Sequence, residues 1–287
     1  MNHAKWRSGV MVGIRQMKGL GLCITFSPLF KHIIQIEDQA IDLKNIGEAG
    51  YRGIELSISD IEDVDWGPFD RHLLENDLEL ITIATGLVRK VNNISLMDSD
   101  HNSRKLAVDR LNKMIKFIGS RGSSSKNILI GYLKGELADD KDYADTQKTW
   151  LKDALTELID TAGIFNVTIV LEVINHNEVN FLCNISDGVD FVTKFNSDHF
   201  KLAIDTYHMN IDEDDISQAI KQAKEHIGYV HLSDDNRGYP GSGNINFPEI
   251  VRVLEEINYR DFLVIECGAF PDKKTALTGG YKYMSNI

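Results

Sequence analysis

The chain contains few cysteines: Cys23, Cys183 and Cys267 are widely spaced among 287 residues. Because no two form a CxxC pair, the sequence has no zinc-ribbon or dithiol redox motif. This usage is typical of reduced thiols, so we expect a cytoplasmic protein. No apolar run approaches the roughly 18 residues of a membrane span, and the first residues lack the apolar core of a secretory signal. We therefore expect no membrane association.

The chain also has fewer basic than acidic residues: 31 Lys and Arg against 43 Asp and Glu, which gives a formal net charge of −12. A nucleic-acid partner normally requires a basic face, so this class of partner is not expected. No G-x-G-x-x-G motif follows the first apolar run, which argues against dinucleotide binding. No linker divides the chain, so we predict one domain over residues 20–287 after an N-terminal extension over residues 1–19.

What is present is a regular alternation of short apolar runs with segments of helical period. The runs are rich in β-branched residues, as in parallel strands buried on both faces. The intervening segments repeat apolar residues every three or four positions, which suits helices packed on a sheet. This pattern predicts an α/β fold, a (β/α)8 TIM barrel, with an open doubly wound sheet as the alternative. The predicted strands are 21–27, 53–59, 78–84, 127–133, 168–174, 201–207, 228–234 and 262–268.

Each of the last four predicted strands carries one ionisable residue among aliphatic ones. Singly, such an acid often caps a helix and such a histidine often lies in a core. Together they would converge, because active sites of TIM barrels lie at the carboxyl ends of the strands. Three buried carboxylates need a cation, and oxygen ligands with one nitrogen favour Mn²⁺, Mg²⁺ or Co²⁺ over structural zinc. The predicted metal ligands are Glu172, Asp205, His231 and Glu266.

Each of these residues lies in a longer sequence motif: "LEVINHNE" (171–178), "DTYHMNIDE" (205–213), "HLSDDNRGYPGSGNINF" (231–247) or "IECGAF" (265–270). With them the chain resembles the sugar isomerase and epimerase family with a xylose-isomerase-like TIM barrel, and within it the D-tagatose and D-psicose 3-epimerase group. The resemblance implies the same four ligands, with Mn²⁺ preferred and Mg²⁺ or Co²⁺ as alternatives. It further implies a sugar substrate, C3 epimerisation of a ketose through a metal-bound enediolate, and a homo-oligomer, either dimer or tetramer.

The resemblance also assigns roles to side chains. Inverting a carbon requires proton transfer on both of its faces, and the family pattern assigns this to Glu172 and Glu266. It assigns contacts with substrate oxygens to Glu178, His208 and Arg237, the last supplying a permanent charge beside a developing oxyanion. Ordinary alternatives stay open: a salt bridge to a neighbouring aspartate for Arg237, a loop hydrogen bond for His208 and simple solvation for Glu178.

Two further features are interpreted less specifically. The glycines of "GYPGSG" (238–243) predict a shaped lip beside the metal, because glycine lets backbone approach a ligand closely. A phosphate cradle is the alternative, although no P-loop lysine follows. Glu55 in "GIELS" is expected at most to support a ligand from behind.

Other functions stay open at this point. An aldose–ketose isomerase related to hydroxypyruvate isomerase, or a dehydratase of the inosose or dehydroshikimate type, would use the same ligands. An apurinic endonuclease of the same fold would need more histidines at strand ends. A non-catalytic sugar-binding barrel would be expected to lack a ligand or base, and none is missing. The substrate could be a free ketose, a keto-acid sugar or a phosphate ester.

Overall fold

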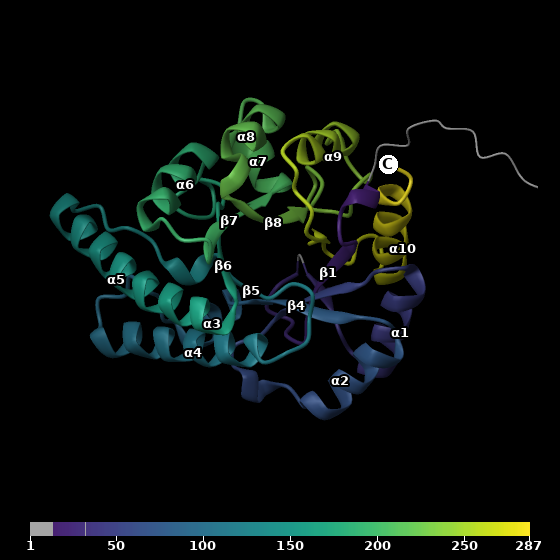
Figure 1. Ribbon diagram of the computed structural model, residues 1–287, viewed down its shortest axis with the longest axis horizontal. Helices are drawn as coiled ribbons and strands as arrows, with labels where there is room; N and C mark the ends of the chain where they lie inside the picture. Colours follow the sequence, from purple (N-terminus) through teal and green to yellow (C-terminus); the bar gives the residue numbers. More distant parts are fainter. Residues whose placement is uncertain (1–13, 32) are drawn as a thin grey trace, which may run out of the picture.

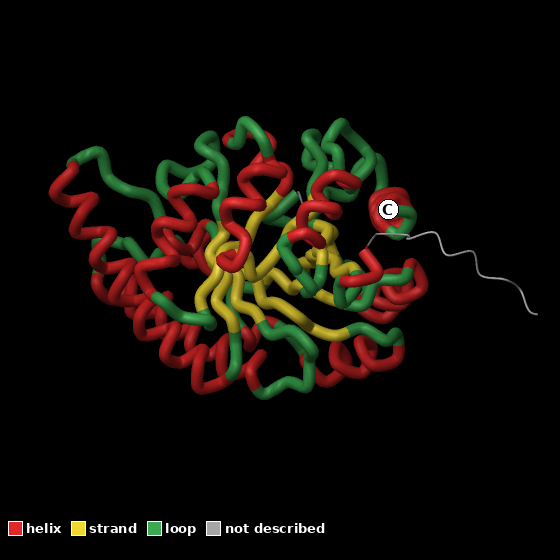
Figure 2. Tube along the Cα trace, turned by 45° about the horizontal axis from the view of Figure 1, so that its top comes forward, coloured by secondary structure: helices red, strands yellow, loops and turns green. Residues whose placement is uncertain are grey.

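The computed structural model describes residues 14–31 and 33–287, and its centre is a closed barrel of parallel strands surrounded by helices (Figures 1 and 2). The strands are β1 (Leu20–Thr25), β2 (Ile34–Gln35), β3 (Gly53–Ser57), β4 (Glu79–Ala84), β5 (Asn127–Ile130), β6 (Thr168–Glu172), β7 (Phe200–Asp205), β8 (Ile227–Leu232) and β9 (Leu263–Ile265). Eight of them form the barrel in chain order, closed by pairing of β9 with β1, and the two-residue β2 pairs in parallel with the end of β1 at Ile24 and Thr25. The predicted single-domain (β/α)8 TIM barrel is confirmed.

Most helices begin at an Asp or Asn whose side chain accepts a hydrogen bond from the first turn, as expected for helix amino-terminal caps. Their apolar stripes, such as Leu151, Leu155 and Leu158, are buried against the barrel. The helices are α1 (Gln39–Ala49), α2 (Trp66–Glu75), α3 (Gly86–Asn92), α4 (His101–Gly119), α5 (Lys141–Phe165), α6 (Ile185–Val192), α7 (Thr206–Asp212), α8 (Ile216–Ala223), α9 (Phe247–Glu256) and α10 (Lys273–Met284). Short 3₁₀ helices span Ile14–Gln16, Ile61–Asp63, Tyr132–Lys134, Thr193–Phe195 and Lys224–His226.

Seven of the eight predicted strands end earlier than their apolar runs predict, and β4 ends at Ala84 as predicted. β6, β7 and β8 each stop two residues before the predicted end, and β5 and β9 stop three residues before it. The hydrophobic pattern reports burial, and the residues after a barrel strand can stay buried while they leave the hydrogen-bonded ladder. The segment after β5 shows this, because its Leu133 is fully buried within a 3₁₀ turn. The chain therefore leaves the sheet at or next to the predicted metal ligands.

The C-terminal segment forms α10, which lies beside α1. The Tyr51 hydroxyl donates a hydrogen bond of 3.0 Å to the Leu277 carbonyl in α10. Cys267, next to the predicted ligand Glu266, is fully buried in the core, and burial raises the pKa of its thiol to about 12. The barrel thus closes within this chain.

The predicted N-terminal extension, residues 1–19, lies largely outside the described residues. From Ile14 onward the chain is described, and the Lys18 ammonium donates to the Ser124 carbonyl at 2.6 Å and lies 3.3 Å from Asp261. Among the described helices, none is both long and apolar enough to cross a membrane.

Candidate active site

The four predicted metal ligands meet at the carboxyl end of the barrel. Glu172 and Asp205 are the last residues of β6 and β7, His231 lies near the end of β8, and Glu266 directly follows β9. In the parallel register Asp205 is the direct partner of His231. One ligand atom from each of the four residues lies within 4.8 Å of the others, and all four residues are buried. We call this group the acidic cluster.

The His231 ring is held between the acidic cluster and a second carboxylate behind it. Its Nδ1 lies 3.5 Å from Glu172, 3.8 Å from Asp205 and 4.0 Å from Glu266. Its Nε2 lies 2.9 Å from Oε2 of Glu55, whose other oxygen accepts a hydrogen bond of 3.0 Å from the Cys23 thiol. A carboxylate of this kind fixes ring orientation and directs Nδ1 toward a cation. The supporting position expected for Glu55 matches this geometry.

Two atoms of the acidic cluster are suited to bind a cation. His231 Nδ1 and Asp205 Oδ2 are fully buried, and neither has a hydrogen-bond partner among the described residues. Leaving a buried polar atom without a partner costs about 1–3 kcal/mol. One divalent ion would satisfy both atoms and reduce the repulsion among three carboxylates. Three oxygen ligands with one imidazole nitrogen therefore fit Mn²⁺, Mg²⁺ or Co²⁺.

The charges of the acidic cluster lead to the same conclusion. Burial raises the pKa of Glu266 well above its usual range, with Glu172 and Asp205 adding to the effect and His231 opposing it. Burial also acts to raise the pKa of Glu172, but His231, with smaller effects of His208 and Lys134, outweighs it and lowers that pKa to about 2. Burial acts to lower the pKa of His231, but Glu55 and Glu266 raise it well above its usual range. Without a cation, the cluster therefore attracts protons.

Two residues after β5 lie behind Glu172, and the sequence pattern did not predict either. The Lys134 ammonium is fully buried and donates to the backbone carbonyl of Glu172 at 3.3 Å. Burial lowers the pKa of Lys134 to about 8, against the opposing effect of the Glu172 charge. At Gly131 a Cβ atom would overlap Oε2 of Glu172. The glycine thus leaves the space that the carboxylate occupies.

The three predicted substrate-binding residues form one hydrogen-bonded network. Arg237 Nη1 donates to Glu178 Oε1 at 2.8 Å, and the Tyr132 hydroxyl donates to the other oxygen of Glu178. The Asn175 amide lies 3.1 Å from Glu178 Oε1 and 2.6 Å from Nδ1 of His208. Arg237 therefore pairs with Glu178 and not with a neighbouring aspartate. Tyr132 and Asn175 complete the network without having been predicted.

The glycine-rich loop is organised by Asp234, which is fully buried. Its Oδ2 accepts from the backbone N–H groups of Gly241 and Gly243 at 2.9 and 2.8 Å, and its Oδ1 accepts from Ile245 N at 3.1 Å. Gly241 has a φ of +90°, a conformation that favours glycine. Because these N–H groups are already engaged by a carboxylate, they are not free to cradle a phosphate.

A cavity of about 540 Å³ opens at this end of the barrel. Burial acts to lower the pKa of Arg237, but the charges of Glu266, Glu178 and Asp205 raise it, so the guanidinium interacts electrostatically with the acidic cluster. Arg237 and Glu178 also line the cavity and so connect it with the cluster. We call it the mouth cavity; its lining residues are Phe30, Gly86, Arg89, Lys90, Asn93, Tyr132, Glu136, Glu178 and Arg237.

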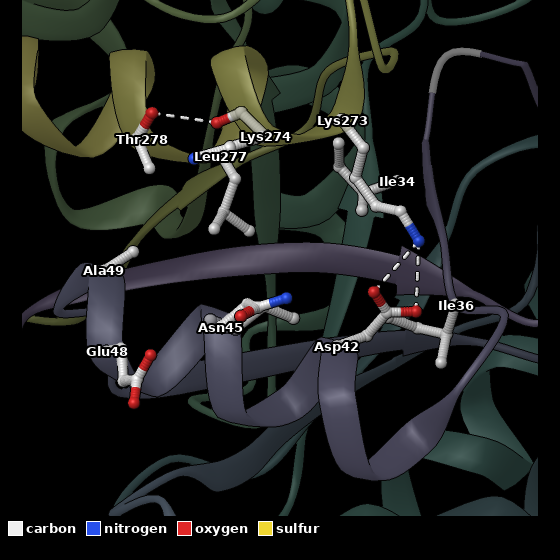
Figure 3. Close-up of a pocket in the computed structure, with 11 residues that line it drawn as sticks. Ile34, Ile36, Asp42, Asn45, Glu48, Ala49, Lys273, Lys274, Leu277 and Thr278 are labelled. Atoms are coloured by element: carbon white, nitrogen blue, oxygen red, sulfur yellow. Dashed lines mark hydrogen bonds and ion pairs between the residues drawn. The ribbon is translucent and has the colours of Figure 1, made fainter.

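A second cavity, of about 610 Å³, lies between α1 and α10 on the outside of the barrel (Figure 3). Its prominent polar contact is internal: Lys273 Nζ lies 3.0 Å from each carboxylate oxygen of Asp42. None of the predicted substrate-binding residues lines it, whereas Glu178 and Arg237 line the mouth cavity. We therefore place the candidate active site at the acidic cluster and the mouth cavity.

The chain belongs to the xylose isomerase-like TIM barrel family, whose model matches residues 43–285. It is 33% identical over 226 residues to an L-ribulose 3-epimerase from Mesorhizobium japonicum, covering 78% of this chain and 73% of that protein. It is 29% identical over 240 residues to a D-psicose 3-epimerase from Ruminiclostridium cellulolyticum, covering 78% and 76%. A solved structure of L-ribulose 3-epimerase matches with a TM-score of 0.75 at 27% identity, over 94% of this chain and 93% of that one. The predicted resemblance to ketose 3-epimerases is confirmed.

Proposed function

We propose that this protein is a divalent-metal-dependent ketose 3-epimerase. The relatives described above are named as epimerases, which supports a sugar epimerase of the isomerase class. The observation that carries the proposal is the acidic cluster, in which Glu172 and Glu266 approach one buried point from β6 and β9, with β7 and β8 between them. Two carboxylates that reach one point from different sides suit proton transfer on the two faces of a carbon.

When bound by Glu172, Asp205, His231 and Glu266, a divalent ion supplies Lewis-acid stabilisation of the oxygens on the reacting carbons. We assign proton removal from C3 to one of the two glutamates, Glu172 and Glu266, and proton return on the opposite face to the other. In the reverse reaction the two exchange roles. Glu55 holds the His231 ring in place through Nε2, which leaves Nδ1 to face the cluster.

The remaining predicted residues hold the substrate. Arg237 carries a permanent charge beside the acidic cluster and lines the mouth cavity, so it suits an oxygen that gains negative charge. His208 accepts from the Asn175 amide at Nδ1, which leaves its Nε2–H as a donor. Glu178, fixed by Arg237 and Tyr132, accepts from a substrate hydroxyl.

The test is a panel of ketoses incubated in D₂O with added Mn²⁺, Mg²⁺ or Co²⁺. We expect the C3 epimer as product, with deuterium incorporated at C3. An aldose product would indicate an aldose–ketose isomerase, and loss of water would indicate a dehydratase. Metal binding without turnover on any ketose would indicate a sugar-binding barrel. Cytoplasmic location and assembly into dimers or tetramers stay predictions.

A further inference from the structure

The mouth cavity extends from Glu178 and Arg237 to helix α3. The Tyr132 hydroxyl bonds Glu178, and the Tyr132 ring stacks with Phe30 at 6.3 Å between centroids and 16° between planes. The Lys90 ammonium lies 4.5 Å from the Phe30 ring centroid. Three successive contacts thus link the candidate active site with Lys90. A substrate held at Glu178 has an aromatic wall along which its far end can extend.

The outer end of the mouth cavity is positively charged. Arg89 and Lys90 are consecutive residues of α3, and both line the cavity. Arg89 pairs with Glu136 at 3.4 Å, but both side chains are partly exposed, and an ion pair of this kind is weak. Lys90 donates to the Leu29 carbonyl at 3.2 Å, and no carboxylate of the described residues forms an ion pair with it.

The charges that line the cavity therefore do not balance. Three cationic residues, Arg89, Lys90 and Arg237, face two anionic ones, Glu136 and Glu178. This local excess occurs in a protein whose formal net charge is −12. A neutral sugar gains hydrogen bonds from such groups but does not compensate their charge, whereas an anionic group does both. The glycine-rich loop is not an alternative anion site, because Asp234 already engages its N–H groups.

We propose that the preferred substrate is a ketose with an anionic group at the end remote from the reacting carbons, bound by Arg89 and Lys90. The group is a phosphate ester or a carboxylate, and both share the chemistry that a cationic pocket recognises. This inference rests on the proposed epimerase function and specifies the substrate class of that site. Lys90 and Arg89 thereby determine specificity without touching the reacting atoms.

The test uses the Mn²⁺-loaded enzyme with D-fructose, D-psicose, D-tagatose and D-sorbose, each as the free sugar, the 6-phosphate and the 6-carboxylate. Affinity is measured by calorimetry, and kcat/KM is measured by deuterium incorporation at C3. We expect at least one anionic form to exceed its neutral parent by about tenfold or more in kcat/KM. The phosphate and carboxylate arms identify which anion is used.

Variants test whether the preference arises at α3. In Lys90→Glu and Arg89→Ala, we expect the ratio of anionic to neutral kcat/KM to fall by about tenfold or more. The matched control is Lys105→Glu on α4, an exposed lysine 2.9 Å from Asp109 and outside the mouth cavity, which should keep the wild-type ratio. A fall that is equal for both substrate forms would overturn the assignment of Lys90.

The two proposals fail in different ways. If the wild-type enzyme epimerises neutral ketoses at least as well as their anionic forms, the anionic-substrate proposal is wrong and the epimerase proposal stands. If no ketose in any form exchanges its C3 proton, the epimerase proposal is wrong. In that case, an anionic ketose that binds more tightly than its neutral parent in calorimetry would still support anion binding by Arg89 and Lys90. Equal affinity for the two forms would overturn it.

Discussion

The two halves of the barrel contribute differently to the candidate site. β6 to β9 supply the acidic cluster itself, one ionisable residue from each strand end. β1 to β5 and the segments after them supply groups that hold or compensate the cluster: Glu55 behind His231, and Lys134 and Tyr132 around Glu172 and Glu178. Under the proposed function, β6 to β9 carry the groups assigned to metal binding and proton transfer, and β1 to β5 hold these groups in place and adjust their charge.

The largest expected effect comes from the two glutamates to which we assign proton transfer. Glu172→Gln and Glu266→Gln each remove a proton-transfer group, so turnover should fall by about 10³-fold or more. Deuterium incorporation at C3 measures this loss, and some metal binding should remain in each variant. The exposed Glu48→Gln on α1, which loses only an ion pair with Lys44, is the control. Full activity in Glu266→Gln would contradict the assignment.

The next effect tests whether the glycine-rich loop depends on one side chain. Asp234→Ala leaves the N–H groups of Gly241, Gly243 and Ile245 without their acceptor, and we expect the free energy of unfolding to fall by about 2–4 kcal/mol. Urea denaturation measures this change. Asp235→Ala is the matched control, because the partly exposed Asp235 side chain accepts from Asn244 at 2.8 Å. Equal losses in the two variants would show that Asp234 has no special role.

A smaller effect is expected from the supporting half. Glu55→Gln offers one carbonyl oxygen to two donors, Cys23 and His231, so the ring is held less firmly. Loss of such a supporting carboxylate typically weakens metal affinity by about 10–100-fold. Mn²⁺ titration measures the affinity, and saturating Mn²⁺ should restore most of the activity. Activity that stays low at saturation would mean that Glu55 acts in some other way.

The smallest effect concerns pH. The pKa values of Glu266 and His231 are raised, so the folded, metal-free protein keeps protons that the unfolded chain releases. Its free energy of unfolding therefore falls as the pH rises from the ordinary pKa values of these groups toward their raised values. A cation must displace the same protons, so Mn²⁺ affinity should rise with pH. We expect the Mn²⁺-induced increase in Tm to grow between pH 5.5 and 8. In Glu266→Gln, the Mn²⁺-induced increase in Tm should change less with pH. A wild-type increase in Tm that does not change with pH would contradict the proposed release of protons.

The acidic cluster could be predicted from the sequence because each member is a lone ionisable residue in an aliphatic strand, and parallel strands bring such ends together. Glu55 lies in an equally apolar strand, but its partner His231 is 176 positions away, and no local pattern links the two. For Asp234, the sequence offered only the alternative that it or Asp235 is the neighbouring aspartate paired with Arg237. Its actual role depends on the path of the loop, which spacing alone does not determine.

Tyr132 and Lys134 were missed for a related reason. The apolar run 127–133 reads as a single strand, whereas β5 ends at Ile130 and a 3₁₀ turn follows. A strand would alternate its side chains across the sheet, while the turn directs Tyr132 to Glu178 and Lys134 to the back of Glu172. The hydrophobic pattern includes Tyr132 but not the charged Lys134, and it does not reveal the change in backbone direction.

The glycine at position 131 sets a limit on how this site can vary. Alanine adds a single methyl group, yet at this position the methyl would compete with the Glu172 carboxylate for the same space. Either the end of β5 or the carboxylate would have to move, and an ångström-scale displacement of a reacting group is enough to slow catalysis. A change made on one strand would thus alter the chemistry of the next. An engineer who wishes to reshape the pocket would do better to begin at α3, where the lining side chains are partly exposed and do not belong to the acidic cluster.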